Sequence, residues 1–153
     1  MKQRIYIDTS VIGGCFDKEF QEWSNKLFDD FRKGNKIAVI SDITLDELSF
    51  SRPEVRNHLN TIPDAFKEYI LNDEQSEELA DQYIKERAVT QKSHEDALHI
   101  AVGAHQKIPY LLTWNLRHMA NATMRPLIET VCADKGYKAP IICTPEELRR
   151  VKP

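Results

Sequence analysis

The sequence has few cysteines and no long apolar run, and both absences exclude classes of protein. Its three cysteines, Cys15, Cys132 and Cys143, form no Cys-x-x-Cys pair, so we predict neither a disulfide framework nor a cysteine zinc site. No run approaches the ~18 apolar residues of a membrane span, and the apolar segment after Met1 is too short for a signal peptide. We therefore expect a cytoplasmic protein with reduced thiols and no membrane segment.

Positive charge is not in excess either. Lysine and arginine number 21 against 24 aspartates and glutamates, which gives a net charge of -3. Overall charge therefore does not indicate a nucleic-acid-binding protein. The chain of 153 residues is 41% hydrophobic and 29% charged, and it has no internal repeat. This length and composition are typical of one globular domain, so we expect residues 1–153 to form a single domain.

Short β-branched or aromatic segments alternate with helical patterns along the chain. A buried strand is predicted at residues 5–7, followed by a flexible turn at Gly13 and Gly14. Further strands are predicted at 36–40, 69–71, 109–113 and 139–143. Helices are predicted at 17–31, 43–50, 54–60, 76–89, 93–104, 120–132 (interrupted or kinked at Pro126) and from Thr144 onward. This alternation predicts an α/β fold, a three-layer α/β/α sandwich around a parallel sheet of four or five strands.

Asp8 directly follows the first predicted strand. In an open parallel sheet, ligands bind beyond the carboxyl ends of the strands, which meet at one edge. The sheet would fix the backbone of Asp8 there, with its side chain facing a crevice. The alternative is that Asp8 only caps a turn or a following helix.

Two further acids are expected at the same edge. Glu47 lies on the inward side of the helix that follows the second strand, whereas Asp46 points further out. Asp96 lies in the first turn of an apolar helix, which predicts that this acid opens onto a cleft. The alternatives are helix capping in both cases, with Thr44 as the partner of Glu47 and Ser93 as the partner of Asp96, or plain surface exposure of Glu47.

Polar residues also lie at the end of the fourth predicted strand and just past it. Asn115 is a common turn residue at such a position, and Thr113 could orient a carboxylate or a water. His99 lies on the same helical face as Asp96, and we interpret it as a packed or hydrogen-bonded core residue rather than a ligand.

The predicted fold brings Asp8, Glu47, Asp96 and Asn115 to a single edge. Crowded like charges are unfavourable unless a cation neutralises them. Carboxylate and amide oxygens are hard ligands that suit Mg²⁺ or Mn²⁺. Such a metal can activate water for attack on a phosphodiester and stabilise the departing oxyanion.

Four short motifs fall on these strand–turn–helix units, at residues 5–10, 40–48, 96–101 and 111–115. In this order the chain resembles a PIN domain, the fold of VapC-like toxins of bacterial toxin–antitoxin pairs. The resemblance implies a metal-dependent ribonuclease in which Asp8, Glu47 and Asp96 are the metal-binding acids. Asn115 stands where many members carry a further aspartate, which weakens a second metal position and favours a one-metal mechanism. The resemblance also implies homodimers and inhibition by a cognate antitoxin whose tail blocks the acidic groove.

The resulting hypothesis assigns a role to each candidate. Asp8 and Asp96 ligate Mg²⁺, and Glu47 ligates it directly or through water and helps to deprotonate the nucleophile. Asn115 and Thr113 position that water, which attacks phosphorus and releases a 3′-hydroxyl and a 5′-phosphate. Candidate phosphate contacts, which could equally be surface residues, are Arg117, His118 and Arg125.

Two other functions are compatible with the sequence. A phosphatase with Asp8 as nucleophile would require a second acidic residue two positions after Asp8, but this position is Ser10. A PIN-like module that binds RNA or a protein partner without turnover is the stronger alternative, because Asn115 supplies no charge.

Overall fold

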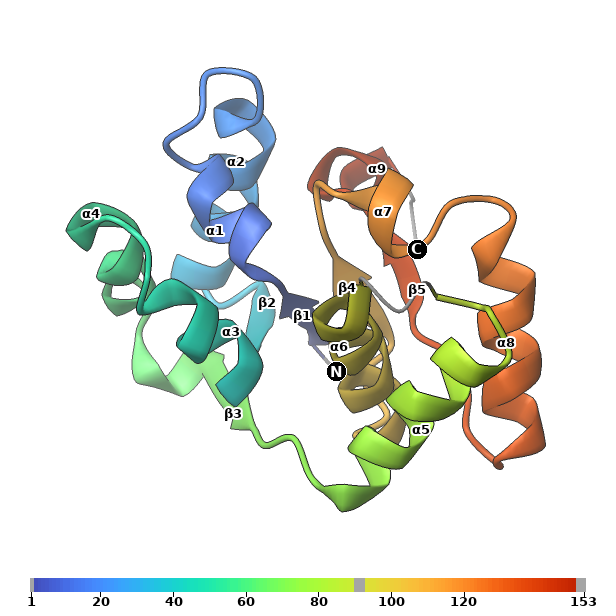
Figure 1. The fold of residues 1–153 in the computed structure, drawn as a ribbon. Coiled ribbons are helices and arrows are strands. Elements are labelled where there is room, and N and C mark those ends of the chain that lie inside the picture. Colours follow the sequence, from blue (N-terminus) through green and yellow to red (C-terminus); the bar gives the residue numbers. More distant parts are fainter. Residues whose placement is uncertain (1, 90–92, 151–153) are drawn as a thin grey trace.

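The structure is a computed structural model, and it describes residues 2–89 and 93–150. Five strands form one parallel sheet in the order β3-β2-β1-β4-β5, with β1 at its centre (Figure 1). Their bounds are β1 Gln3–Ile7, β2 Lys36–Ser41, β3 Lys67–Ile70, β4 Tyr110–Leu112 and β5 Ile141–Cys143.

Helices surround this sheet, and short 3₁₀ turns at His58–Thr61 and Asp64–Phe66 precede β3. Within the described residues they are α1 Thr9–Gly14, α2 Gln21–Arg32, α3 Asp42–Leu48, α4 Pro53–Arg56, α5 Glu74–Lys85, α6 His94–His105, α7 Leu116–Met119, α8 Met124–Asp134 and α9 Pro145–Arg150. None of these helices is long and apolar enough to cross a membrane.

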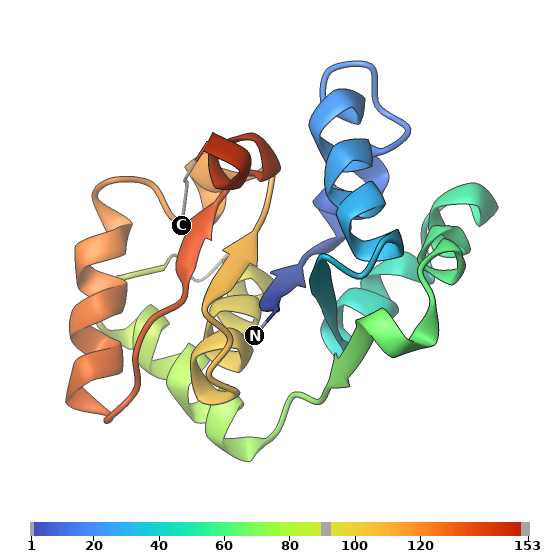
Figure 2. The ribbon, with the colours of Figure 1, turned by 180° about the vertical axis from the view of Figure 1, so that it is seen from behind.

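The core lies on both faces of the sheet because side chains alternate along each strand. Tyr6 and Val39 face a cluster formed with α5, α6 and α8. Ile5 and Ile7 face a second cluster formed mainly with α1, α2, α4 and α9. In Figure 1 α6 lies in front of the sheet, and in Figure 2, seen from behind, the strands lie in front of it. The predicted α/β fold with helices on both faces of a parallel sheet is confirmed.

Several segments differ from the prediction; the predicted helix at 54–60, for example, is α4 followed by the 3₁₀ turn at His58–Thr61. A helix, α1, follows Asp8 where a turn at Gly13 and Gly14 was expected. The predicted helix at 120–132 begins only at Met124, as α8, and a separate short helix, α7, precedes it at Leu116–Met119. Pro126 is the third residue of α8, where its missing N–H has no intrahelical partner to lose, so it does not kink the helix.

Candidate active site

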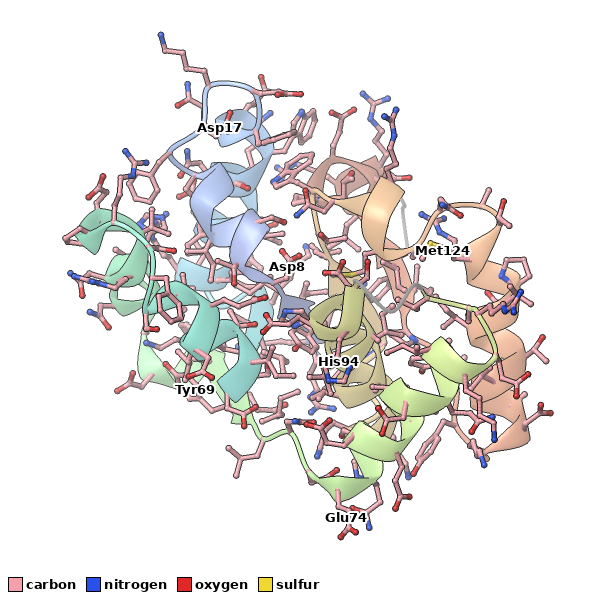
Figure 3. The ribbon with its side chains drawn as sticks, in the orientation of Figure 1. Asp8, Asp17, Tyr69, Glu74, His94 and Met124 are labelled. Carbon is pink, nitrogen blue, oxygen red and sulfur yellow. The ribbon has the colours of Figure 1, made fainter. Side chains whose placement is uncertain are left out.

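Asp8 is the N-cap of α1 and lies almost fully buried at the carboxyl end of β1. Its Oδ1 accepts hydrogen bonds from the Ser10 hydroxyl at 2.6 Å and from the Val11 backbone N–H at 3.2 Å. The predicted capping role of Asp8 is therefore confirmed. Asp8 also lies at the edge of the sheet where the candidate site was expected. Figure 3 marks Asp8 between α3 and the start of α6. Burial raises the pKa of Asp8, and the charge of His99 and the hydroxyl hydrogen bonds offset this only in part.

The segment after β4 is tied to the start of α1 through Ser10. The Ser10 hydroxyl accepts the Trp114 backbone N–H at 2.9 Å and lies 3.4 Å from Thr113 Oγ1. Thr113 Oγ1 in turn accepts the Asn115 backbone N–H at 2.9 Å. Thr113 is buried beside Asp8, whereas Asn115 is exposed at the start of α7.

Glu47 turns inward from α3, as its helical phase predicted, while Asp46 is exposed. Glu47 Oε1 accepts the Thr9 hydroxyl at 2.6 Å and lies 3.0 Å from His99 Nε2. The Thr44 backbone N–H is capped by Ser41 instead, so the capping alternative for Glu47 is wrong. Burial alone would raise the pKa of Glu47, but the hydrogen bond and charge of His99 outweigh it and lower this pKa to about 2.

His99 links the candidate acids. It is 1% exposed, with Nδ1 at 2.6 Å from the Tyr6 hydroxyl and Nε2 on Glu47, so its interpretation as a hydrogen-bonded core residue is confirmed. Burial lowers the pKa of His99, but the hydrogen bond to Glu47 and the charges of Glu47, Asp8 and Asp96 raise it above its ordinary value. The three predicted acids therefore act electrostatically on one buried side chain.

An acid-lined groove of about 460 Å³ opens beside Glu47. Asp96 is half-buried in the first turn of α6, and its exposed neighbour Glu95 reaches the groove. The hydrogen bond and charge of Glu47 raise the pKa of Glu95. Polar and apolar residues both line the groove: Asp42, Ile43, Asp46, Glu47, Phe50, Asn72, Glu77, Glu95 and Leu98.

Sequence reasoning missed the residues that hold the acids. Tyr6, Thr9 and Ser10 each contact a candidate acid or His99. One signal was available: Tyr6 lies on β1 and Asp8, in extended conformation, follows that strand two residues later, so the two side chains point to the same side of the sheet.

Carboxylates from three different elements have the donor chemistry that Mg²⁺ or Mn²⁺ requires. A buried carboxylate whose pKa is raised by burial is also a group that a bound cation would stabilise in its ionised form. Over residues 2–89 and 93–150, however, no three His, Cys, Asp or Glu side chains are grouped closely enough to hold a metal ion. The donors fit the metal chemically, but Glu47 Oε1 is engaged by His99 and Thr9.

The candidate phosphate contacts lie on the segment after β4. Arg117 is exposed on α7. The Arg125 guanidinium donates to the carbonyl of Ala120, the residue after α7, at 2.8 Å and so connects the end of α7 to α8. The side chain of His118 lies outside the described part of the structure.

No protein-family model and no curated protein matches the sequence, but solved structures resemble the fold. FitAcB from Neisseria gonorrhoeae aligns with a TM-score of 0.57 at 14% identity, over 93% of this chain and 98% of that one. VapC20 from Mycobacterium tuberculosis, a Sarcin-Ricin loop cleaving toxin, aligns at 0.53 and 14% identity, over 76% and 93%. VapBC2 from Rickettsia felis, bound to a promoter DNA fragment, aligns at 0.53 and 16% identity, over 75% and 90%. The chain therefore has the fold of a PIN domain of the VapC-like type.

Proposed function

We propose that this chain is a metal-dependent endoribonuclease that hydrolyses RNA phosphodiester bonds, as the toxin of a type II toxin–antitoxin pair. One observation carries the proposal: Asp8, Glu47 and Asp96 come from three elements, and their charges all act on the same buried histidine. The similarity in fold to VapC20, described as a Sarcin-Ricin loop cleaving toxin, supports the same activity.

Asp8 and Asp96 would hold a Mg²⁺ or Mn²⁺ ion, with Glu47 as a third ligand directly or through water. Such an ion would supply charge neutralisation and activate water for attack on phosphorus. Glu47, with a pKa of about 2, is ionised at neutral pH and would accept a hydrogen bond from that water. Thr113 supports the ionised form of Asp8 through its hydroxyl, and Asn115, whose backbone N–H donates to Thr113 Oγ1, would orient the water.

The partners follow from the same proposal. RNA is the substrate, and Arg117, exposed two residues after Asn115, is a candidate phosphate contact. An antitoxin partner is supported by the similarity in fold to VapBC2 and FitAB, each solved with a DNA fragment, and to the toxin VapC20. We also propose a homodimer, with residues 1–153 forming one domain in each cytoplasmic copy.

Cleavage of total RNA tests the activity directly. We expect cleavage with Mg²⁺ or Mn²⁺, none with chelator, and a rate lower by roughly 100-fold or more in Asp96→Asn, because the loss of a ligand charge weakens cation binding. Asp81→Asn, which removes an exposed acid from α5, is the matched control and should cleave like the wild type. Equal rates for Asp96→Asn and the wild type would contradict the assignment.

Asn115→Asp should increase the affinity of the site for the divalent cation. An added carboxylate at this edge contributes attraction of about 1 kcal/mol to a divalent cation, or more. The Mg²⁺ concentration for half-maximal cleavage should therefore fall by roughly 10-fold. A titration of the cleavage rate with Mg²⁺ measures this concentration. If it is the same in the variant and the wild type, Asn115 does not belong to the metal site.

A second function is favoured by a specific observation. Because Glu47 is engaged by His99 and Thr9, and the described acids are not grouped as a ligand shell, the chain could be a catalytically weakened PIN-like module that binds RNA or a protein partner. RNA binding with no cleavage under any metal condition would identify this function.

A further inference from the structure

A continuous chain of buried hydrogen bonds runs behind Glu47. Its Oε1 lies 3.0 Å from His99 Nε2, and His99 Nδ1 lies 2.6 Å from the Tyr6 hydroxyl. The Tyr6 hydroxyl lies 2.6 Å from Ser41 Oγ, which accepts the Thr44 backbone N–H at 3.1 Å. Tyr6, His99, Ser41 and Thr44 are all buried, so water does not compete for these bonds.

The direction of these bonds follows from the chemistry of the groups. An ionised carboxylate only accepts, so His99 Nε2 carries the proton that Glu47 accepts. His99 Nδ1 pairs with the Tyr6 hydroxyl whichever of the two donates, and the Tyr6 hydroxyl pairs in turn with Ser41 Oγ. The Thr44 hydroxyl donates to the Ile7 carbonyl at 3.3 Å, so every polar group in the chain has a partner.

The contacts join the elements that carry the candidate acids. Tyr6 lies on β1, two residues before Asp8, while His99 lies on α6, three residues after Asp96. Glu47 lies on α3 and is also held by Thr9 at the start of α1. A change in the position of His99 would therefore alter how Glu47 is presented to the other two acids.

We propose that Tyr6 and His99 form a positioning unit that fixes the Glu47 carboxylate for the divalent ion. The inference rests on the proposed function, because it needs an ion at this site. Hydrogen bonds to ligating carboxylates orient them, and their loss weakens metal affinity or activity by roughly 10- to 100-fold. His99 is a positioning residue that holds Glu47 by a hydrogen bond, and its charge also acts on Asp8.

Removal of one hydroxyl tests the unit. Tyr6→Phe should weaken Mn²⁺ binding, measured by calorimetry on the intact chain, by roughly 10-fold, and should lower kcat for RNA cleavage without raising KM for RNA. Tyr83→Phe is the matched control, because Tyr83 is equally buried in the same core cluster and its hydroxyl contacts Cys132 Sγ at 2.9 Å. It should leave both quantities unchanged.

Two replacements of His99 separate its two bonds. Glutamine places an amide donor where Nε2 stands, so His99→Gln should retain most of the Mn²⁺ affinity. Asparagine reaches only the Nδ1 position, so His99→Asn should lose roughly 10-fold or more. Unfolding temperatures of all four variants, measured without metal, show whether each one folds.

The possible results separate a failure of the positioning role from a failure of the proposed nuclease function. If the wild type binds Mn²⁺ and cleaves RNA, but Tyr6→Phe behaves like Tyr83→Phe, the positioning role is wrong and the nuclease stands. Equal or tighter Mn²⁺ binding by His99→Asn would also overturn it. A wild type that neither binds Mn²⁺ nor cleaves RNA overturns both.

Discussion

Asp8→Asn is expected to abolish metal-dependent RNA cleavage and, at the same time, to stabilise the metal-free fold. Cleavage should stop because asparagine supplies no charge for the cation. The fold should survive because the amide oxygen can still accept from the Ser10 hydroxyl and the Val11 N–H, the two hydrogen bonds that cap α1. Cleavage at the wild-type rate would contradict the role of Asp8.

The stability change has a definite pH dependence. Burial raises the pKa of Asp8 above the ordinary value of 3.8, so the folded state holds its proton more tightly than the unfolded state. The wild type therefore loses stability as pH rises from about 3.8 through the folded pKa, and Asp8→Asn does not. At pH 7 without metal the variant should therefore be the more stable of the two, and the difference should shrink as the pH falls towards and below 3.8.

Urea unfolding in the presence of chelator measures this difference, and added Mg²⁺ provides a second comparison. Because Mg²⁺ binds only the folded site, it should raise the free energy of unfolding of the wild type and leave that of Asp8→Asn unchanged. A variant less stable than the wild type at pH 7 would show that the buried carboxylate stabilises the fold, contrary to its raised pKa.

Alanine at Gly13 and at Gly14 should have effects of opposite sign. A Cβ at Gly14 would lie 2.6 Å from Ser24 Oγ and 2.7 Å from Trp114 Nε1, two atoms that are hydrogen-bonded to each other at 2.9 Å. Trp114 would have to move, and overpacking of this kind costs about 1–3 kcal/mol. A Cβ at Gly13 has no atom within 4 Å, so Gly13→Ala should stabilise α1 by up to about 1 kcal/mol.

The Gly14 variant should also affect the candidate site. The backbone N–H of Trp114 donates to Ser10 Oγ, and that hydroxyl donates to Asp8, so a shifted Trp114 should lower RNA cleavage, whereas Gly13→Ala should not. Urea unfolding and a cleavage assay on both variants measure these effects. Changes of the same sign and size in the two variants would contradict the packing at Gly14.

The sheet and its core could be predicted from the sequence because their signals are local. The run Ile5-Tyr6-Ile7 is apolar and β-rich, and the structure buries it completely. The helix α1 could not be predicted, because its six residues include two glycines and form no helical stripe of their own. It depends on the Asp8 cap and on packing against α2 and α3, which are supplied by the tertiary structure.

The candidate site was predictable only at the level of topology. The order of strands and helices brings Asp8, Glu47 and Asp96 to one edge, and the structure places all three charges within reach of His99. The bonds that orient Glu47 join residues 38 and 52 positions apart. No periodicity in the sequence encodes such contacts, so the role of His99 as a partner of Glu47 emerged only from the structure.

Diffraction from crystals grown with Mn²⁺, recorded to show the anomalous signal of the metal, tests the central claim most directly. We predict a single Mn²⁺ peak at the carboxyl end of β1, in contact with the carboxylates of Asp8 and Asp96 and with Glu47 directly or through one water. A Mn²⁺ ion bound elsewhere, or no peak at this edge in a chain that still cleaves RNA, would contradict the assignment of these acids as the catalytic metal site.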